Sequence, residues 1–219
     1  MASLKLSTPS CTVVAGSTGS GKSFLVKRML SECNFLFDQP VSKILYCYTA
    51  FQPLFEIMEK EIPNITFHKG LPSESVLESL ASDRSHTICV LDDLQGEVVS
   101  SAEMEQLFTV HSHHKNISVI FILQNIFASG KHARSLALQA HHVFILKSLR
   151  DRSQMTCLSR QIFGKGGVIP EAFDDVNHEN KFPYLLIDLA PHSIDKFRLR
   201  SQIFQGEDTV VYVPKSIKA

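Results

Sequence analysis

The clearest chemical signal in the sequence is a glycine- and serine-rich octapeptide near the N-terminus, GSTGSGKS. It fits the pattern G-x-x-x-x-G-K-[ST], in which backbone N–H groups surround the phosphates of a nucleotide at the start of a helix. We expect Lys22 to reach the β- and γ-phosphates and Ser23 to coordinate Mg²⁺. The predicted nucleotide-binding residues are Gly16, Ser17, Thr18, Gly19, Ser20, Gly21, Lys22 and Ser23.

Two acidic residues end the apolar run TICVLDD, residues 87–93. A buried strand that delivers an acid at its carboxyl end is typical of the metal-binding strand of nucleotide hydrolases. Asp92 is predicted to hold Mg²⁺ through water, together with Ser23, and Asp93 to polarise the attacking water. Glutamate is more usual than aspartate at the second position and is one methylene longer, so Glu97 is an alternative base.

Two further polar residues are candidates for catalysis. Gln124 directly follows the apolar run SVIFIL, where a polar residue can sense the γ-phosphate, although a polar residue can also simply end a strand. Arg134 lies before the next apolar run and is interpreted either as a group reaching a nucleotide on a neighbouring subunit or as a solvated arginine at a helix start. With Lys22 and Asp93, these residues complete the predicted catalytic set.

Short apolar runs alternate with helical patterns along the first 150 residues or so. Because the runs are apolar on both faces, they indicate a mostly parallel sheet covered by helices on both sides, an α/β three-layer sandwich. The predicted strands are 11–15, 43–48, 65–69, 86–93, 118–123, 142–146, 184–189, 195–200 and 209–213. The predicted helices are 23–33, 51–60, 102–114, 152–163 and one that begins near Ser73. We expect one domain over 1–219, with 180–219 as a C-terminal extension whose alternating KFRLR segment adds an antiparallel edge strand.

Composition limits the classes of partner. The chain has 219 residues, with 22 Lys+Arg against 22 Asp+Glu, so any contact with nucleic acid needs a local basic patch. Residues 131–165 hold seven basic residues and one acid, a candidate surface for a phosphate backbone or an ordinary solvated face. No apolar run is long enough to cross a membrane, and the N-terminus lacks the pattern of a signal peptide. Five scattered cysteines indicate free thiols in a reducing compartment.

The order of these motifs resembles the FtsK/HerA-type branch of P-loop ATPases, and more narrowly the poxvirus-type genome-packaging ATPases found also in Maverick/Polinton elements. The resemblance covers roughly residues 11–204 and rests on GSTGSGKS, VLDDL, VHSHHKNISVIFILQNIF, KHARSLALQAHHVFILKSLRDRSQMTCLSRQIF and PYLLIDLAPHSIDKFRLRSQIF. It implies a RecA-like P-loop fold with an additional strand between the phosphate-loop strand and the acidic strand. The site residues that it carries over are Lys22, Ser23, Asp92, Asp93, Gln124 and Arg134.

The same resemblance implies an activity and partners. The chain would hydrolyse ATP with Mg²⁺ as a pentameric or hexameric ring, and drive double-stranded viral DNA into a preformed capsid, with no membrane contact. It would act inside the host cell, at a nuclear or cytoplasmic site of virus assembly or on the virion itself. Two alternatives stay open: a nucleotide kinase, for which no lid with spaced arginines is evident, and a non-catalytic nucleotide-dependent binding module of viral origin, against which the intact Lys22, Ser23 and Asp92 argue.

Overall fold

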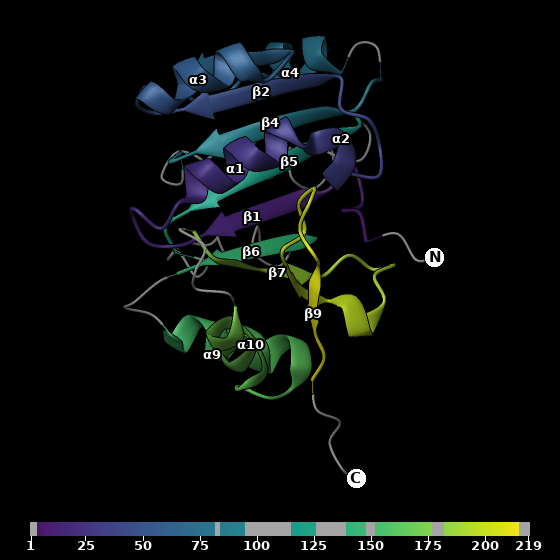
Figure 1. Cartoon of the computed structure of the whole chain (residues 1–219). Coiled ribbons are helices and arrows are strands. Elements are labelled where there is room, and N and C mark those ends of the chain that lie inside the picture. The colour runs from purple at the N-terminus through teal and green to yellow at the C-terminus, as the bar shows by residue number, and fades with distance from the viewer. Residues whose placement is uncertain are drawn as a thin grey trace.

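A single sheet organises the described part of the chain, residues 4–81, 84–94, 115–125, 139–147, 152–176 and 182–214 of the computed structural model. Its strand order is β3-β2-β4-β5-β1-β6-β7-β8-β9 (Figure 1). The strands are β1 (Cys11–Ala15), β2 (Lys43–Tyr48), β3 (Ile65–Lys69), β4 (Thr87–Asp92), β5 (Ile117–Leu123), β6 (His142–Leu146), β7 (Tyr184–Asp188), β8 (Leu199–Ser201) and β9 (Val210–Tyr212). The helices are α1 (Lys22–Ser31), α2 (Cys33–Leu36), α3 (Pro53–Glu61), α4 (Glu74–Leu80), α9 (Arg152–Phe163) and α10 (Val168–Asp175).

The six strands from β3 to β6 are parallel, and β7, β8 and β9 continue the sheet in antiparallel pairing. The strand β5 lies between β1 and β4, with Ala15 opposite Leu123 and Asp92 opposite Ile122. The carboxyl ends of these three strands therefore meet at one edge of the sheet. The predicted α/β sandwich, with an additional strand between the phosphate-loop strand and the acidic strand, is confirmed.

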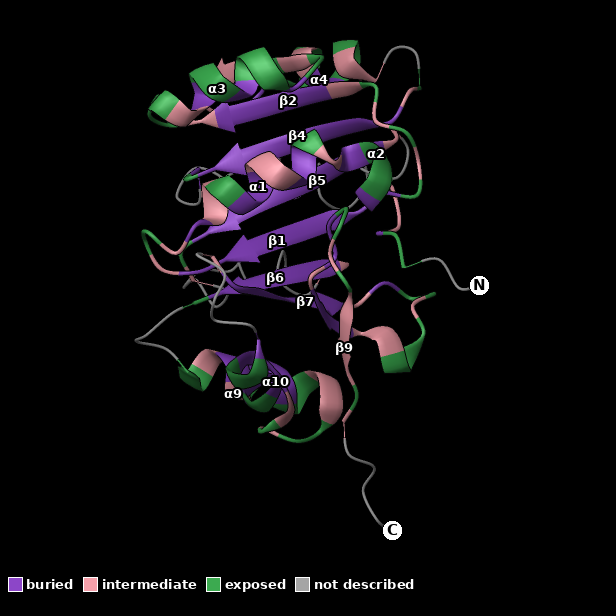
Figure 2. Ribbon diagram, in the orientation of Figure 1, coloured by how far each residue is buried: buried purple, intermediate pink, exposed green. Residues whose placement is uncertain are grey.

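Two separate apolar cores cover the two faces of the sheet. One core joins alternate strand residues to α4, α9 and α10, and the other joins the remaining strand residues to α1, α2 and α3. The central strands are buried along their whole length, as Figure 2 shows, because helices lie on both faces. The cysteines of β1, β2 and β4 are buried in this sheet as free thiols. Within the described ranges, no helix has the length and apolar character needed to span a bilayer.

The structure corrects the prediction for the C-terminal residues. Asp195–Phe197 forms a short 3-10 helix, so the predicted strand over 195–200 is reduced to β8. That strand is not at the sheet edge, because β9 pairs with it on the far side. The antiparallel part of the sheet begins earlier, at β7. The helix α10 was not predicted, and the helix predicted over 102–114 lies outside the described residues.

The C-terminal residues are bound to the first helix of the chain. Arg28 of α1 forms an ion pair with Glu207 at 2.6 Å, and its guanidinium lies 4.2 Å from the centre of the Phe204 ring. Glu32, at the end of α1, accepts a hydrogen bond of 2.7 Å from the backbone N–H of Gln205. The residues that follow β8 therefore fix the helix that carries Lys22 and Ser23, and they belong to the same packed unit as the phosphate loop.

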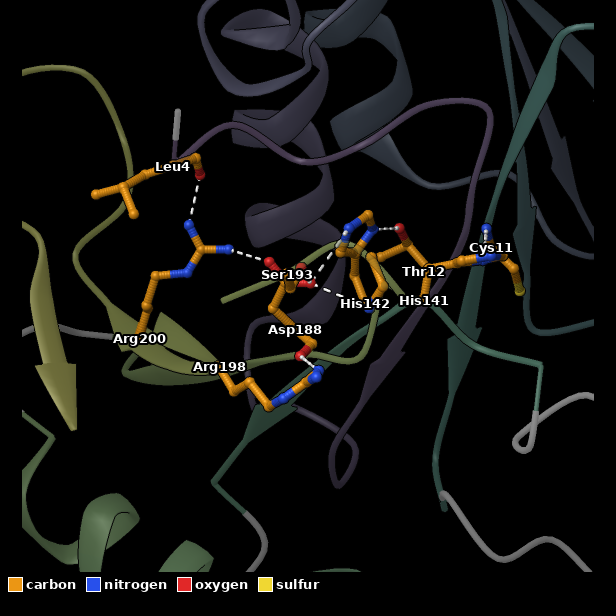
Figure 3. Close-up of polar contacts among 10 residues, drawn as sticks. Leu4, Cys11, Thr12, His141, His142, Asp188, Ser193, Arg198 and Arg200 are labelled. Atoms are coloured by element: carbon orange, nitrogen blue, oxygen red, sulfur yellow. Dashed lines mark hydrogen bonds and ion pairs between the residues drawn. The ribbon is translucent and has the colours of Figure 1, made fainter. Parts of the chain in front are cut away.

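A buried polar network joins the N-terminal segment to the antiparallel part of the sheet (Figure 3). The guanidinium of Arg200 donates to a carboxylate oxygen of Asp188 at 2.5 Å and to the backbone carbonyl of Leu4 at 2.5 Å. The Nε2 atom of His142 lies 4.0 Å from the other oxygen of Asp188, and its Nδ1 atom is 3.3 Å from the hydroxyl of Thr12. The network thus connects β1, β6, β7 and β8 with the N-terminal segment.

We expect this network to make stability depend on pH. Burial lowers the pKa of His142 to about 4; the charges of His141 and Arg200 act in the same direction, and that of Asp188 opposes them. In the unfolded chain an imidazole has a pKa of about 6.5. Between these values the unfolded state binds a proton that the folded state excludes, so we expect stability to fall, by about 3 kcal/mol at most, as the pH drops from 6.5 to 4.

Urea unfolding of wild-type and His142→Gln protein at pH 7.5 and pH 5 measures this effect. The variant lacks the titrating ring, so its stability should change less between the two pH values than that of the wild type. Equal changes in the two proteins would show that His142 does not carry the acid sensitivity, whatever the absolute stability of the variant.

Candidate nucleotide site

The loop Gly16–Ser23 connects β1 to α1 and is held against the ends of the neighbouring strands. The backbone N–H of Gly16 donates to the carbonyl of Leu123 at the end of β5, at 3.2 Å. The hydroxyl of Ser17 donates to the carbonyl of Lys147, just after β6, at 3.1 Å. The loop therefore starts from a fixed position, and α1 directs its N-terminal backbone N–H groups toward the same edge of the sheet.

Two glycines of the loop are required by close contacts. A Cβ on Gly16 would lie 2.6 Å from the hydroxyl of Ser20 and 2.9 Å from Cβ of Leu146. Gly21 has a φ of 96°, and a Cβ there would lie 2.2 Å from the ring of Phe182. Only glycine satisfies both positions without displacing the neighbouring side chains, and the positive φ of Gly21 adds backbone strain for any other residue. The spacing of the glycines thus has a packing reason in addition to its chemical one.

Lys22 lies across the loop that precedes it. Its ammonium donates to the carbonyl of Gly16 at 2.8 Å and to that of Ser17 at 3.0 Å. Burial lowers the pKa of this ammonium, whereas the negative charges of Asp92 and Asp93 act to raise it. The lysine therefore faces the two acids at the end of β4, and it brings a positive charge to the concave side of the loop.

The loop and the two strand ends β4 and β5 line an open cavity of about 370 Å³. This volume lies within the range of roughly 300–1,000 Å³ that is common for small-molecule sites. The cavity is lined by Thr18, Gly19, Gly21, Lys22, Ser23, Phe24, Gln52, Pro53, Leu54, Asp92, Asp93, Ile122, Leu123, Gln124 and Phe182. The structure therefore brings five loop residues together with three polar residues predicted from β4 and β5. The remaining loop residues, Gly16, Ser17 and Ser20, do not line the cavity.

Asp92 is the last residue of β4 and is buried. One of its carboxylate oxygens accepts a hydrogen bond of 2.8 Å from the hydroxyl of Tyr46, a fully buried residue of β2. Burial raises the pKa of the Asp92 carboxyl, as does the charge of Asp93, while the Tyr46 hydrogen bond and the charge of Lys22 lower it. Tyr46 thus fixes one oxygen and leaves the other available to the cavity.

Asp93 and Gln124 are exposed on the cavity side of the sheet edge. Asp93 has a φ of 57°, which is uncommon outside glycine but tolerated by aspartate and asparagine. Its backbone carbonyl accepts a hydrogen bond of 3.0 Å from the hydroxyl of Thr49, which follows β2. The chain therefore turns sharply after Asp92, so that two consecutive acids occupy different environments, one buried and one in contact with solvent.

Two predicted site residues, Arg134 and Glu97, lie outside the described residues. Conversely, sequence reasoning missed Tyr46, Phe24 and Phe182. A signal for Tyr46 was present, because a tyrosine in a buried strand needs a partner for its hydroxyl. No local pattern connects Phe182 to a loop that precedes it by 159 residues or more.

The basic segment is partly described. Lys147, Arg152, Arg160 and Lys165 are exposed, and the guanidinium of Arg152 forms a bidentate ion pair with the carboxylate of Asp174 in α10. This pairing occupies the hydrogen-bonding edge of Arg152. The other three described residues have exposed side chains: Lys147 follows β6, Arg160 lies on α9 and Lys165 follows α9. Lys131, Arg134 and Arg150 lie outside the described ranges.

Solved structures with similar folds include viral packaging ATPases and a bacterial secretion ATPase. The genome packaging NTPase of Sulfolobus turreted icosahedral virus 2, in complex with ATP-gammaS, has a TM-score of 0.50 and 14% identity over 94% of this chain and 98% of that one. The DNA-packaging ATPase of Sulfolobus turreted icosahedral virus has a TM-score of 0.51 and 12% identity over 94% of this chain and 98% of that one.

The cytoplasmic domain of the type VII secretion ATPase EccC from Thermomonospora curvata has a TM-score of 0.53 and 14% identity over 96% of this chain and 26% of that one. The sequence matches no protein-family model and no curated protein. At these identities the likeness concerns the fold. The chain therefore has the fold of P-loop packaging and secretion ATPases, as its resemblance to the FtsK/HerA-type branch implied.

Proposed function

We propose that this chain hydrolyses ATP and uses the energy to move double-stranded DNA during the packaging of a viral genome. The observation that carries the hydrolytic part is the cavity itself, in which Lys22 and Ser23 face Asp92, Asp93 and Gln124. A phosphate-binding loop alone serves many nucleotide-binding proteins. Its pairing with a buried acid and an exposed acid on one strand end supports hydrolysis in particular.

Each group has a distinct proposed role. The backbone of the loop and the Lys22 ammonium bind the phosphates, and Lys22 stabilises the charge that develops on the transferred phosphoryl group. Asp93, which is exposed to the cavity, orients and polarises the attacking water. Gln124 contacts the γ-phosphate from the end of β5. Arg134 of a neighbouring subunit would complete the site, as arginine fingers do in related chemistry.

The donor groups at the site fit Mg²⁺. This ion prefers hard oxygen ligands and binds through one or two carboxylates together with phosphate oxygens. Asp92 offers one carboxylate oxygen that Tyr46 does not occupy, and Ser23, which carries a hydroxyl, lines the same cavity. Bound Mg²⁺ would neutralise phosphate charge. Asp92 and Ser23 would hold the ion, and Tyr46 would keep the Asp92 carboxylate in place.

The proposals of DNA, a ring and a capsid rest on the sequence resemblance and on the kinds of protein that share the fold. One of the proteins that share the fold is a viral DNA-packaging ATPase. Arg160 on α9 and Lys165 just after it are exposed, and they offer positive charge for phosphate groups. We place the protein at a site of virus assembly in the host cell, as a pentameric or hexameric ring on a capsid.

The deciding experiment measures ATP hydrolysis with and without double-stranded DNA, together with the oligomeric mass of the same sample. We expect Mg²⁺-dependent hydrolysis that DNA stimulates, and a mass several times that of one chain. Transfer of phosphate to nucleoside monophosphates would identify a kinase instead. ATP binding without turnover, with or without DNA, would identify a binding module.

A further inference from the structure

Two phenylalanines form a stacked pair beside the phosphate loop. Phe24 lies in the first turn of α1, directly after Ser23, and Phe182 lies just before β7. Their ring centres are 5.2 Å apart and the ring planes are 19° from parallel. The pair therefore joins the first helix to the segment before β7, beside the cavity.

The pair is continuous with the phosphate-binding surface. Both rings line the same cavity as Lys22 and Ser23. The ring of Phe182 lies directly over Gly21, so close that a Cβ there would overlap it. A ligand with phosphates in the loop would therefore meet an aromatic surface within the same cavity.

Phe24 is unusual within its helix. The apolar residues Leu25, Val26, Met29 and Leu30 of α1 are buried against the sheet. Phe24 instead leaves 53% of its surface exposed, on the cavity side. Stacking on a second ring fixes the orientation of an exposed ring, so that it presents a preformed apolar plane. A planar aromatic ligand can stack on such a surface.

We infer that the Phe24–Phe182 pair is the subsite for the nucleobase of a nucleoside triphosphate. This inference rests on the proposed function, because the triphosphate occupies the loop. Phenyl rings carry no hydrogen-bond donor or acceptor, and every base has an aromatic face, so the contribution of the pair is shared by ATP and GTP. The pair raises the affinity for nucleotides above that for a bare triphosphate.

The test compares the dissociation constants of ATP, GTP and inorganic tripolyphosphate by calorimetry. Tripolyphosphate probes the loop without a base. We expect Phe24→Leu to weaken ATP and GTP by about tenfold each and to leave tripolyphosphate unchanged. Phe24→Tyr keeps an aromatic plane and should bind as the wild type does. Phe35→Leu changes a similarly exposed phenylalanine of α2 that does not line the cavity, and it serves as the control.

Three results would overturn the inference alone: equal affinities of the wild type for ATP and tripolyphosphate, unchanged ATP binding by Phe24→Leu, or an equal loss for ATP and tripolyphosphate in that variant. The last would mean that the pair shapes the loop and does not bind the base. A wild-type protein that binds neither ATP nor tripolyphosphate would overturn the proposed function as well.

Discussion

Replacing Lys22 with alanine is expected to reduce ATP hydrolysis by a factor of about 10² to 10³ or more. The ammonium bridges the carbonyls of Gly16 and Ser17 and faces the acids at the end of β4, so it brings its charge to the concave side of the loop. Without it, the charge that develops on the phosphoryl group loses a preorganised partner in a half-enclosed site. The rate of phosphate release at saturating ATP gives the measurement.

Lys27→Ala is the matched control for this variant. Lys27 lies about 1.4 turns further along α1, and its ammonium pairs with Glu61 on the surface at 2.6 Å. It is a lysine of the same helix that does not line the cavity. Its loss should leave turnover close to that of the wild type. Wild-type turnover by Lys22→Ala would remove the phosphate-loop assignment.

The second large effect is expected for Asp93→Asn, which should retain ATP binding and lose turnover by a factor of about 10² to 10⁴. The amide has the same shape as the carboxylate but cannot take a proton. Asparagine also tolerates the left-handed backbone that Asp93 adopts, so the turn after β4 should persist. Single-turnover hydrolysis and ATP binding, measured on the same sample, separate the two effects.

Asp208→Asn, at an exposed position before β9, controls for the loss of one negative charge. It should hydrolyse ATP as the wild type does. A normal rate for Asp93→Asn combined with a slow rate for Glu97→Gln would mean that Glu97 is the base. In that case the Asp93 carboxylate, exposed at the cavity, would serve only to neutralise nearby positive charge.

The strands of the parallel sheet were predictable because their residues are apolar on both faces. The runs at residues 11–15, 43–48, 65–69 and 142–146 match the observed strands in full. A strand that is buried on both faces of a sheet has a continuous apolar sequence, with turn residues before and after it. The position of β5 between β1 and β4 came from the family resemblance, since periodicity carries no information on strand order.

Local sequence patterns did not predict the helix α10 or the correct extent of β8. The helix α10, for which no element was predicted, contains Pro170 and two consecutive acids. The proline occupies the third helical position, where the backbone N–H has no partner within the helix, so it does no harm. Alternation in KFRLR predicted one longer strand, but its first part forms a turn before β8.

Some residues of the candidate site were predictable from local motifs, and others were not. The loop and the two acids were visible as motifs, because their chemistry requires fixed residue types at fixed spacing. Tyr46 contacts Asp92 from a neighbouring strand, and Phe182 contacts Gly21 from a segment far along the chain. Their roles depend on which strands are neighbours, β2 beside β4 in the case of Tyr46, and this appears only in the folded chain.

The strand order also determines when the molecule can form during its synthesis. β1 is made first, yet Cys11 pairs with Val119 of β5 and Thr12 with His142 of β6. A nascent chain that has emerged only as far as β4 therefore has no described ladder partner for β1. Pairing at such separation in sequence carries a large loop-closure cost and slows folding. We thus expect β1 and its phosphate loop to remain unassembled on the ribosome until well over half of the chain has been translated.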